Sequence, residues 1–126
     1  MKTQYTVALA MLAGVGLGAA CVNGLQAQGK PGAYAIIEIN EVTDADGFKQ
    51  VVTTKGPASV AASSGHFIVR TENITSTDGG APKRVVIIGF DSMDKLKAWN
   101  ASAAQKEVDA LRIKTTKSRQ FFVDGM

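Results

Sequence analysis

The sequence is poor in the residues that most often carry chemistry or cross-links. Among 126 residues it contains one cysteine, Cys21, and one histidine, His66. Cys21 lies in an N-terminal segment that we expect to be removed. The rest of the chain then has no cysteine, which excludes disulfides, thiol catalysis and cysteine metal sites there. A single histidine makes a weak basis for a metal site, so no metal and no cofactor are expected.

An excess of positive charge is also missing. The chain has 14 lysines and arginines against 11 acidic residues, a formal net charge of +3. The basic residues between Lys106 and Arg119 are diluted by Glu107 and Asp109. A nucleic-acid binder would be expected to carry a concentrated basic stripe with stacking aromatic residues. We therefore interpret this segment as a solvated helix face and expect no nucleic-acid partner.

The N-terminal segment has the pattern of a secretory signal. Lys2 is the only charge before Lys30, and Val7 to Leu17 is an apolar run interrupted only by glycine. The run is shorter than the roughly 20 residues of a membrane span. Leu25-Gln26-Ala27 fits a cleavage site. We predict a signal peptide at residues 1–27, a flexible lead-in at 28–32 and one domain at 33–126. The mature protein is expected to be periplasmic or secreted, with no membrane association after cleavage.

Hydrophobic periodicity and turn residues predict the elements of this domain. Asp44 and either Asp91 or Ser92 are suited to cap the two main helices. Gly56-Pro57 is expected to break or kink the first helix. Strands are predicted at 33–40, 66–72, 83–90 and 119–124, with helices at about 44–62 and 91–99 and a further helical turn or two after Ser102.

The order strand, helix, strand, strand, helix, strand is typical of the α+β class and of the ferredoxin-like βαββαβ plait. We predict a four-stranded antiparallel sheet with its helices on one face. The first and third strands are nonetheless expected to pair in parallel across the first helix, with a right-handed connection.

The sheet face without helices is also expected to be buried. Val85 to Ile88, Ile36-Ile37 and Phe121-Phe122 are apolar at successive positions, so both faces of their strands carry apolar side chains. An uncovered apolar sheet of this size indicates a contact with another protein or a ligand groove. We predict a homodimer in which two sheets pack together.

Several short blocks, in their order and spacing, resemble the bacterial domain of unknown function 1330 over nearly the whole mature chain. They are Tyr34–Ile39, Gly65–Arg70, Lys83–Ile88, Phe90–Met93, Ala98-Trp99, Ala110–Arg112 and Ser118-Arg119. The resemblance implies the dimeric α/β-barrel superfamily, which also holds cofactor-independent monooxygenases, small-lactone isomerases and haem-binding members. The family has no agreed reaction, so the resemblance assigns no catalytic residue.

The chain departs from the family pattern at three places. Gly89 stands where the family usually has an acidic residue, and Asn100 where it has an aromatic one. Ser102-Ala103-Ala104 replaces a proline-containing helix start. A pocket that depends on those groups is therefore in doubt in this chain.

His66 is the candidate catalytic residue, as a proton carrier at the start of the second strand. Alternatively, it is an exposed strand end. Arg70 has the same strand parity as His66 and is predicted to share its face. Arg70, Arg112 and Arg119 are the candidate ligands for a small-molecule anion. Alternatively, they form ion pairs with residues such as Glu38 or Glu72.

Two functions remain open. The leading hypothesis is an exported dimeric domain of unknown biochemical function that binds a small organic molecule. The alternative is a cofactor-independent enzyme of the monooxygenase or isomerase kind that uses a histidine proton carrier. A partly apolar cavity adjoining His66 would favour the enzyme.

Overall fold

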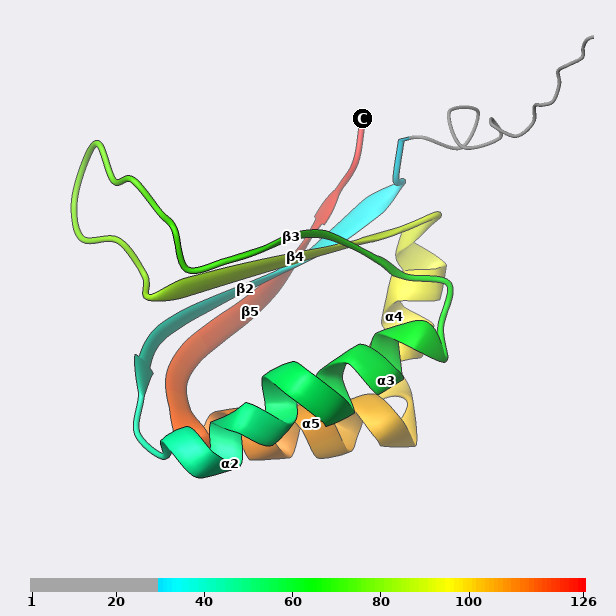
Figure 1. Cartoon of the computed structure of the whole chain (residues 1–126). Helices are drawn as coiled ribbons and strands as arrows, with labels where there is room; N and C mark the ends of the chain where they lie inside the picture. The colour runs from blue at the N-terminus through cyan, green and yellow to red at the C-terminus, as the bar shows by residue number, and fades with distance from the viewer. Residues whose placement is uncertain (1–29) are drawn as a thin grey trace, which may run out of the picture. The chain divides into compact units, whose positions relative to one another are not determined.

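The computed structural model describes residues 30–126, and the predicted signal peptide lies outside them. The chain alternates strands with helices on one side of a single sheet (Figure 1). The elements are β2 (Ala33–Val42), α2 (Ala45–Gln50), the π-helix η1 (Val51–Lys55), α3 (Gly56–Ala61), β3 (His66–Thr71), β4 (Arg84–Phe90), α4 (Met93–Ala101), α5 (Ala103–Thr115) and β5 (Thr116–Asp124).

The four strands lie in the order β3-β4-β2-β5, and every neighbouring pair is antiparallel. This confirms the predicted ferredoxin-like plait. The predicted parallel pairing of the first and third strands is wrong, because β2 and β4 are antiparallel neighbours. β3 and β4 form a hairpin that inserts β4 between β2 and β3. The parallel pair linked across the first helical segment is therefore β2 and β3, which do not touch.

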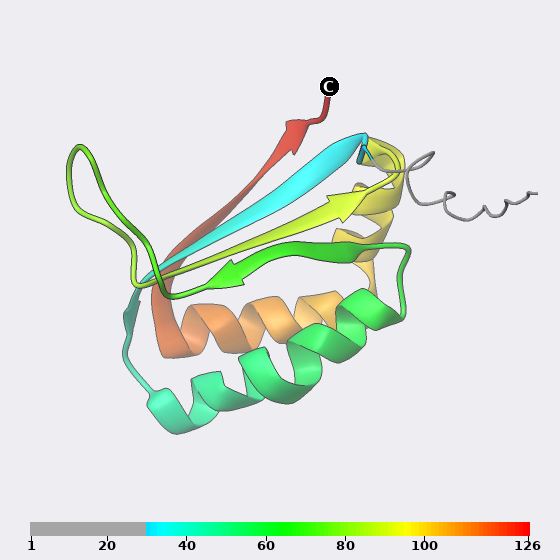
Figure 2. The same ribbon diagram turned by 45° about the horizontal axis from the view of Figure 1, so that its top comes forward.

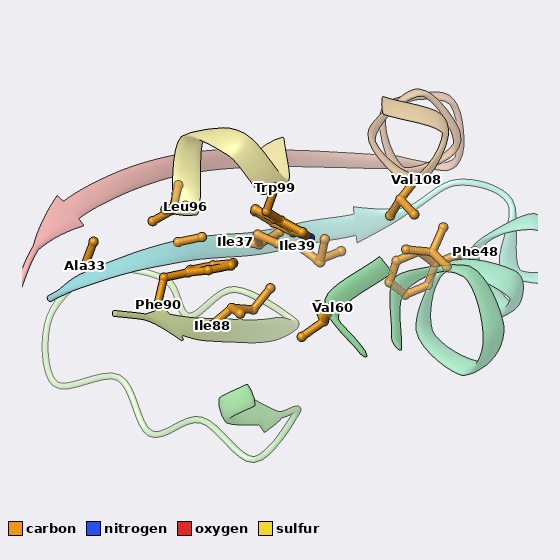
Figure 3. Packing of buried hydrophobic residues seen from close by; sticks show 12 residues of the cluster. Ala33, Ile37, Ile39, Phe48, Val60, Ile88, Phe90, Leu96, Trp99 and Val108 are labelled. Atoms are coloured by element: carbon orange, nitrogen blue, oxygen red, sulfur yellow. The ribbon is translucent and has the colours of Figure 1, made fainter. Parts of the chain in front are cut away.

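All the helices lie against one face of the sheet, and no described helix covers the other (Figures 1 and 2). Alternate residues of β2 are directed at the helices and buried: Ala33, Ala35, Ile37 and Ile39. Figure 3 shows how the core is closed over them, with Phe90 and Trp99 in contact at ring centroids 5.1 Å apart. Trp99 is 3 % exposed and belongs to the core.

The first helical segment begins as predicted, with the Asp44 carboxylate accepting a hydrogen bond from the Gly47 amide at 3.1 Å. It does not break at Gly56-Pro57. Before the proline the helix widens into η1, in which the Gly56 amide donates to the Val51 carbonyl five residues back. The wider turn lets the helix accommodate a proline, whose ring would clash with a regular α-helical turn.

The C-terminal helix is longer than predicted. Ser102 separates α4 from α5: its hydroxyl donates to the Trp99 carbonyl at 2.7 Å and accepts from the Gln105 amide at 3.2 Å. α5 then runs for 13 residues, and β5 follows at Thr116 without a loop. Thr115 and Thr116 are buried, and their hydroxyls donate to carbonyls of the last helical turn. Buried threonines give no apolar signal, so the sequence pattern missed this junction.

Candidate functional site

A small cavity lies between the helix layer and the sheet face that it covers, with a volume of about 60 Å³. Its walls are mainly apolar. Side chains from β2, β3, β4 and the helices line it, among them Ile39, Phe48, Val60, Phe67, Ile88 and Trp99. Small-molecule sites are typically of this kind, with apolar walls and a few polar groups that fix the ligand's orientation.

Three arginines from different elements join this apolar lining: Arg70 of β3, Arg84 of β4 and Arg112 of α5. Arg70 is exposed, whereas the side chain of Arg84 is 16 % exposed and that of Arg112 is 8 % exposed. The opening of the cavity therefore lies near Arg70, and Arg112 lies at its inner end. Arginine remains charged at any pH at which proteins fold, so all three side chains are positively charged.

Arg84 and Arg112 each have a buried Nε–H group without a hydrogen-bond partner. Both Nη atoms of Arg112 and the Nη1 atom of Arg84 do have partners. Arg84 Nη1 lies 3.5 Å from an Oε2 atom of the exposed Glu72. Arg112 donates to Ser118 Oγ at 2.8 Å and to Asp109 Oδ1 at 3.3 Å. An unsatisfied buried donor costs free energy, and such a group in a native structure calls for an explanation, one of which is a bound molecule that completes the hydrogen bond.

A chain of buried hydrogen bonds holds Arg112 in place. Trp99 Nε1 donates to Ser59 Oγ at 3.0 Å, and that hydroxyl donates to Gln105 Oε1 at 2.8 Å. Gln105 Nε2 in turn donates to Asp109 Oδ1 at 3.0 Å, the same oxygen that receives Arg112 Nη2. The network joins α3, α4 and α5, and it fixes the orientation of the Arg112 guanidinium.

His66 does not belong to this cavity. It is exposed at the start of β3, opposite Gly89 on the face without helices. The predicted shared face of His66 and Arg70 is wrong, because β3 has a bulge between Phe67 and Val69. The extra residue, Ile68, inverts the alternation. Arg70 therefore pairs with Val86 on the helix-covered face, where its guanidinium lies 4.4 Å above the Phe67 ring.

Arg119 also lies away from the cavity, on the face without helices, where it pairs with Glu38 of β2. Its Nε donates to Glu38 Oε1 at 2.9 Å. This hydrogen bond, together with the negative charge of Glu38, raises the pKa of Arg119 above its ordinary value. The alternative interpretation, an ion pair with Glu38, describes Arg119 correctly.

The structure thus brings together two of the three candidate arginines, Arg70 and Arg112, and separates them from His66 and Arg119. Sequence reasoning missed Arg84 and Gln105. The sequence did contain a signal for Arg84, because it occupies the same set of alternate positions as Val86, Ile88 and Phe90, which lie on the core side of β4.

The three departures from the family pattern do not shape the cavity directly. Neither Gly89 nor Asn100 lines it, and Ser102 caps α5 in place of a proline.

Within residues 30–126 no helix is long and apolar enough to cross a membrane. The same residues contain no cluster of three or more histidine, cysteine or acidic side chains that could hold a metal ion.

The topology and the one-sided helix layer define an α+β protein of the ferredoxin-like fold. A family model described as "Domain of unknown function (DUF1330)" matches residues 32–126. The chain belongs to this family. No curated protein is significantly similar to the sequence.

Solved structures share the fold at low sequence identity. A protein of unknown function from Rhodopseudomonas palustris is 10 % identical with a TM-score of 0.60, covering 86 % of this chain and 95 % of its own. A cofactor-independent oxygenase from Streptomyces nogalater is 14 % identical with a TM-score of 0.54, covering 74 % and 91 %. A provisionally assigned antibiotic biosynthesis monooxygenase from Caulobacter crescentus is 21 % identical with a TM-score of 0.52, covering 76 % and 92 %.

Proposed function

We propose that the protein binds a small organic anion in the cavity between its helices and its sheet. The observation that carries this proposal is the convergence of Arg70, Arg84 and Arg112 on one apolar cavity, where two buried guanidinium N–H groups have no acceptor. An apolar wall binds the carbon skeleton of the ligand, and the arginines bind its charge.

The charges around the cavity favour a negative ligand. Three arginines face it, while Glu72 and Asp109 are the only described carboxylates that form ion pairs with them. One positive charge is left uncompensated. That charge belongs to the exposed Arg70, and an anion that enters the cavity would pair with it.

Ligand binding is tested by calorimetric titration of the protein with phenolic, enolic and carboxylic acids. Arg70→Gln, Arg84→Gln and Arg112→Gln are compared with Arg119→Gln, which removes an arginine from the opposite face. The first three substitutions should weaken binding and the fourth should not. Equal effects of all four would contradict the cavity as the binding site.

The enzymatic alternative receives less support. A general base must lie within hydrogen-bond reach of the proton that it removes. The described residues that line the cavity include no imidazole and no carboxylate, and His66 lies on the other face. The structural likeness to oxygenases, at 21 % identity or less, extends to the fold alone.

We further propose that the protein is a homodimer formed through the face without helices. Ile36, Val85, Ile87 and Phe121 lie on this face in adjacent strands. They are half-buried although no described helix covers them. An apolar patch of this kind is typical of a protein contact, and a stable dimer would bury at least about 1,000 Å² in total.

Finally, we propose that the domain acts outside the cytoplasm after removal of residues 1–27. The support is the apolar run from Val7 to Leu17 and the small-residue site that ends at Ala27.

A further inference from the structure

The sheet register places Arg84 and Arg112 on the two sides of Ile39. Arg84 pairs with Ile39 from β4, and Ser118 pairs with Ile39 from β5. Arg112 donates to the Ser118 hydroxyl, so its guanidinium lies beside that strand. Two strand spacings separate the Arg84 and Ser118 backbones by roughly 10 Å. This distance lets two long side chains approach one small group between them, above Ile39.

We infer that the ligand is a monocarboxylate with a short apolar tail, and that its two oxygens accept the free Nε–H groups of Arg84 and Arg112. This inference rests on the proposed function, because it specifies the ligand of the same cavity. Arg70, which is exposed and already lies over Phe67, contributes charge at the opening and not a buried hydrogen bond.

The number of free donors favours a carboxylate. Among their buried nitrogen atoms, Arg84 and Arg112 each have one without a hydrogen-bond partner, Nε. A carboxylate offers two oxygens in a plane and can satisfy both donors at once. The charge agrees with this count, because the ion pairs with Glu72 and Asp109 leave one of the three positive charges uncompensated. A doubly charged phosphate group would bring an unmatched negative charge into an apolar cavity.

The size of the cavity favours a short tail. Its volume of about 60 Å³ is well below the roughly 150 Å³ of a cavity that holds benzene. The tail would extend from Ile39 toward Ile88 and Trp99, which line the same cavity. Within this space each added methylene should strengthen binding, until the cavity is filled.

The experiment is a calorimetric titration of the full-length protein with straight-chain carboxylates from acetate to octanoate. Affinity should rise about fourfold for each methylene, as expected from the burial of a methylene group. The rise should stop at a short chain length, when further carbons no longer fit. The primary amides of the same acids and inorganic phosphate should bind at least tenfold more weakly than the best carboxylate.

Arg84→Lys is the decisive variant, because lysine keeps the positive charge but has no Nε–H group. It should weaken the best carboxylate about ten- to a hundredfold, as expected for the loss of a charge-assisted buried hydrogen bond. Arg119→Lys is the matched control and should leave the affinity unchanged. Arg112→Lys also removes bonds to Asp109 and Ser118 and can unfold the domain, so circular dichroism accompanies it and the Arg84 variant carries the test.

The outcomes separate this inference from the proposed function. If phenolic or enolic acids bind in an arginine-dependent manner and no carboxylate does, the cavity binds an anion but the carboxylate assignment is wrong. If carboxylates bind and Arg84→Lys weakens them no more than Arg119→Lys, the two-arginine arrangement is wrong. If no organic acid binds the folded protein, both the inference and the proposed function fail.

Discussion

The indole N–H of Trp99 donates to the hydroxyl of Ser59 at 3.0 Å, although the two residues are 40 positions apart. Both side chains are buried. The same hydroxyl donates to Gln105, so a single oxygen connects α3, α4 and α5 beneath the cavity. The orientation of Arg112 depends on this connection, because Gln105 and Arg112 share an oxygen of Asp109.

Ser59→Ala should therefore destabilise the domain. It leaves the Trp99 N–H and the Gln105 Oε1 atom buried without a partner, at a cost of about 1–3 kcal/mol. Ser64→Ala, at an exposed position on the following turn, is the control. The free energies of unfolding in urea would measure the difference. Equal stabilities of the two variants would mean that the hydrogen-bond network contributes little to the free energy of unfolding.

Gly32→Ala should also destabilise the fold, for a different reason. A Cβ atom at this position would lie 2.3 Å from the carbonyl oxygen of Asp91, a backbone atom that cannot move aside alone. The backbone of Gly32 is also held on both sides, by bonds to Phe90 and Gly125. We expect a loss of about 1–3 kcal/mol. Gly80→Ala, where a Cβ atom would meet nothing within 4 Å, is the control. Thermal unfolding of both variants tests this difference.

Adjacent residues of β4 should respond in opposite ways to the introduction of a charge. Ile87 pairs with Ile36 on the face without helices, whereas Ile88 is 2 % exposed in the core. Ile87→Asp should give a folded monomer, and Ile88→Asp should unfold the domain, because a carboxylate buried in the core has no partner. Sedimentation and circular dichroism distinguish the two results. A folded monomer of the unmodified protein at micromolar concentration would contradict the dimer.

Replacement of His66 tests the enzymatic alternative. Because His66 is exposed on the face away from the cavity, His66→Ala should change neither the stability nor the affinity for an organic anion. Titration with the best ligand and a thermal melt would measure both. Loss of a catalytic turnover in this variant, with the fold intact, would favour the enzymatic alternative.

If residues 1–27 are a signal peptide, as we propose, the mature protein should begin near Gln28 in the periplasm or outside the cell. N-terminal sequencing of protein from separated cell fractions checks this prediction. Recovery of the intact N-terminus from the cytoplasm would show that residues 1–27 are not removed.

Most of the fold could be predicted from the sequence, because the relevant signals are local. The alternation in β2 and the capping side chain of Asp44 depend on neighbouring residues alone. The antiparallel pairing of β2 with β4 depends on long-range contacts, so the pattern did not reveal it. The junction at Thr116 was missed because its buried residues are polar.

The candidate site was harder to predict. Regular alternation along the strand predicted that Arg70 lies on the same face as His66. The bulge at Ile68 places Arg70 on the opposite face instead. Bulges depend on how two strands fit together and have no reliable signature in one strand. Arg84 was overlooked because a charged residue at the start of a strand is usually solvated. Its burial results from the helices that pack over the sheet.

Ile68 also has a consequence for the comparison of relatives. A homologue that lacks this one residue would have a regular β3 and would still direct its arginine at the cavity, because Arg70 would remain opposite Val86. A homologue that keeps the residue but pairs without the bulge would direct the arginine to the other face, with the residue at Val69 toward the helices. Two homologues could then carry the same arginine at the same aligned column and use it on opposite surfaces, one for a ligand and the other for a second subunit. In this strand, an alignment without gaps does not show which surface the arginine occupies.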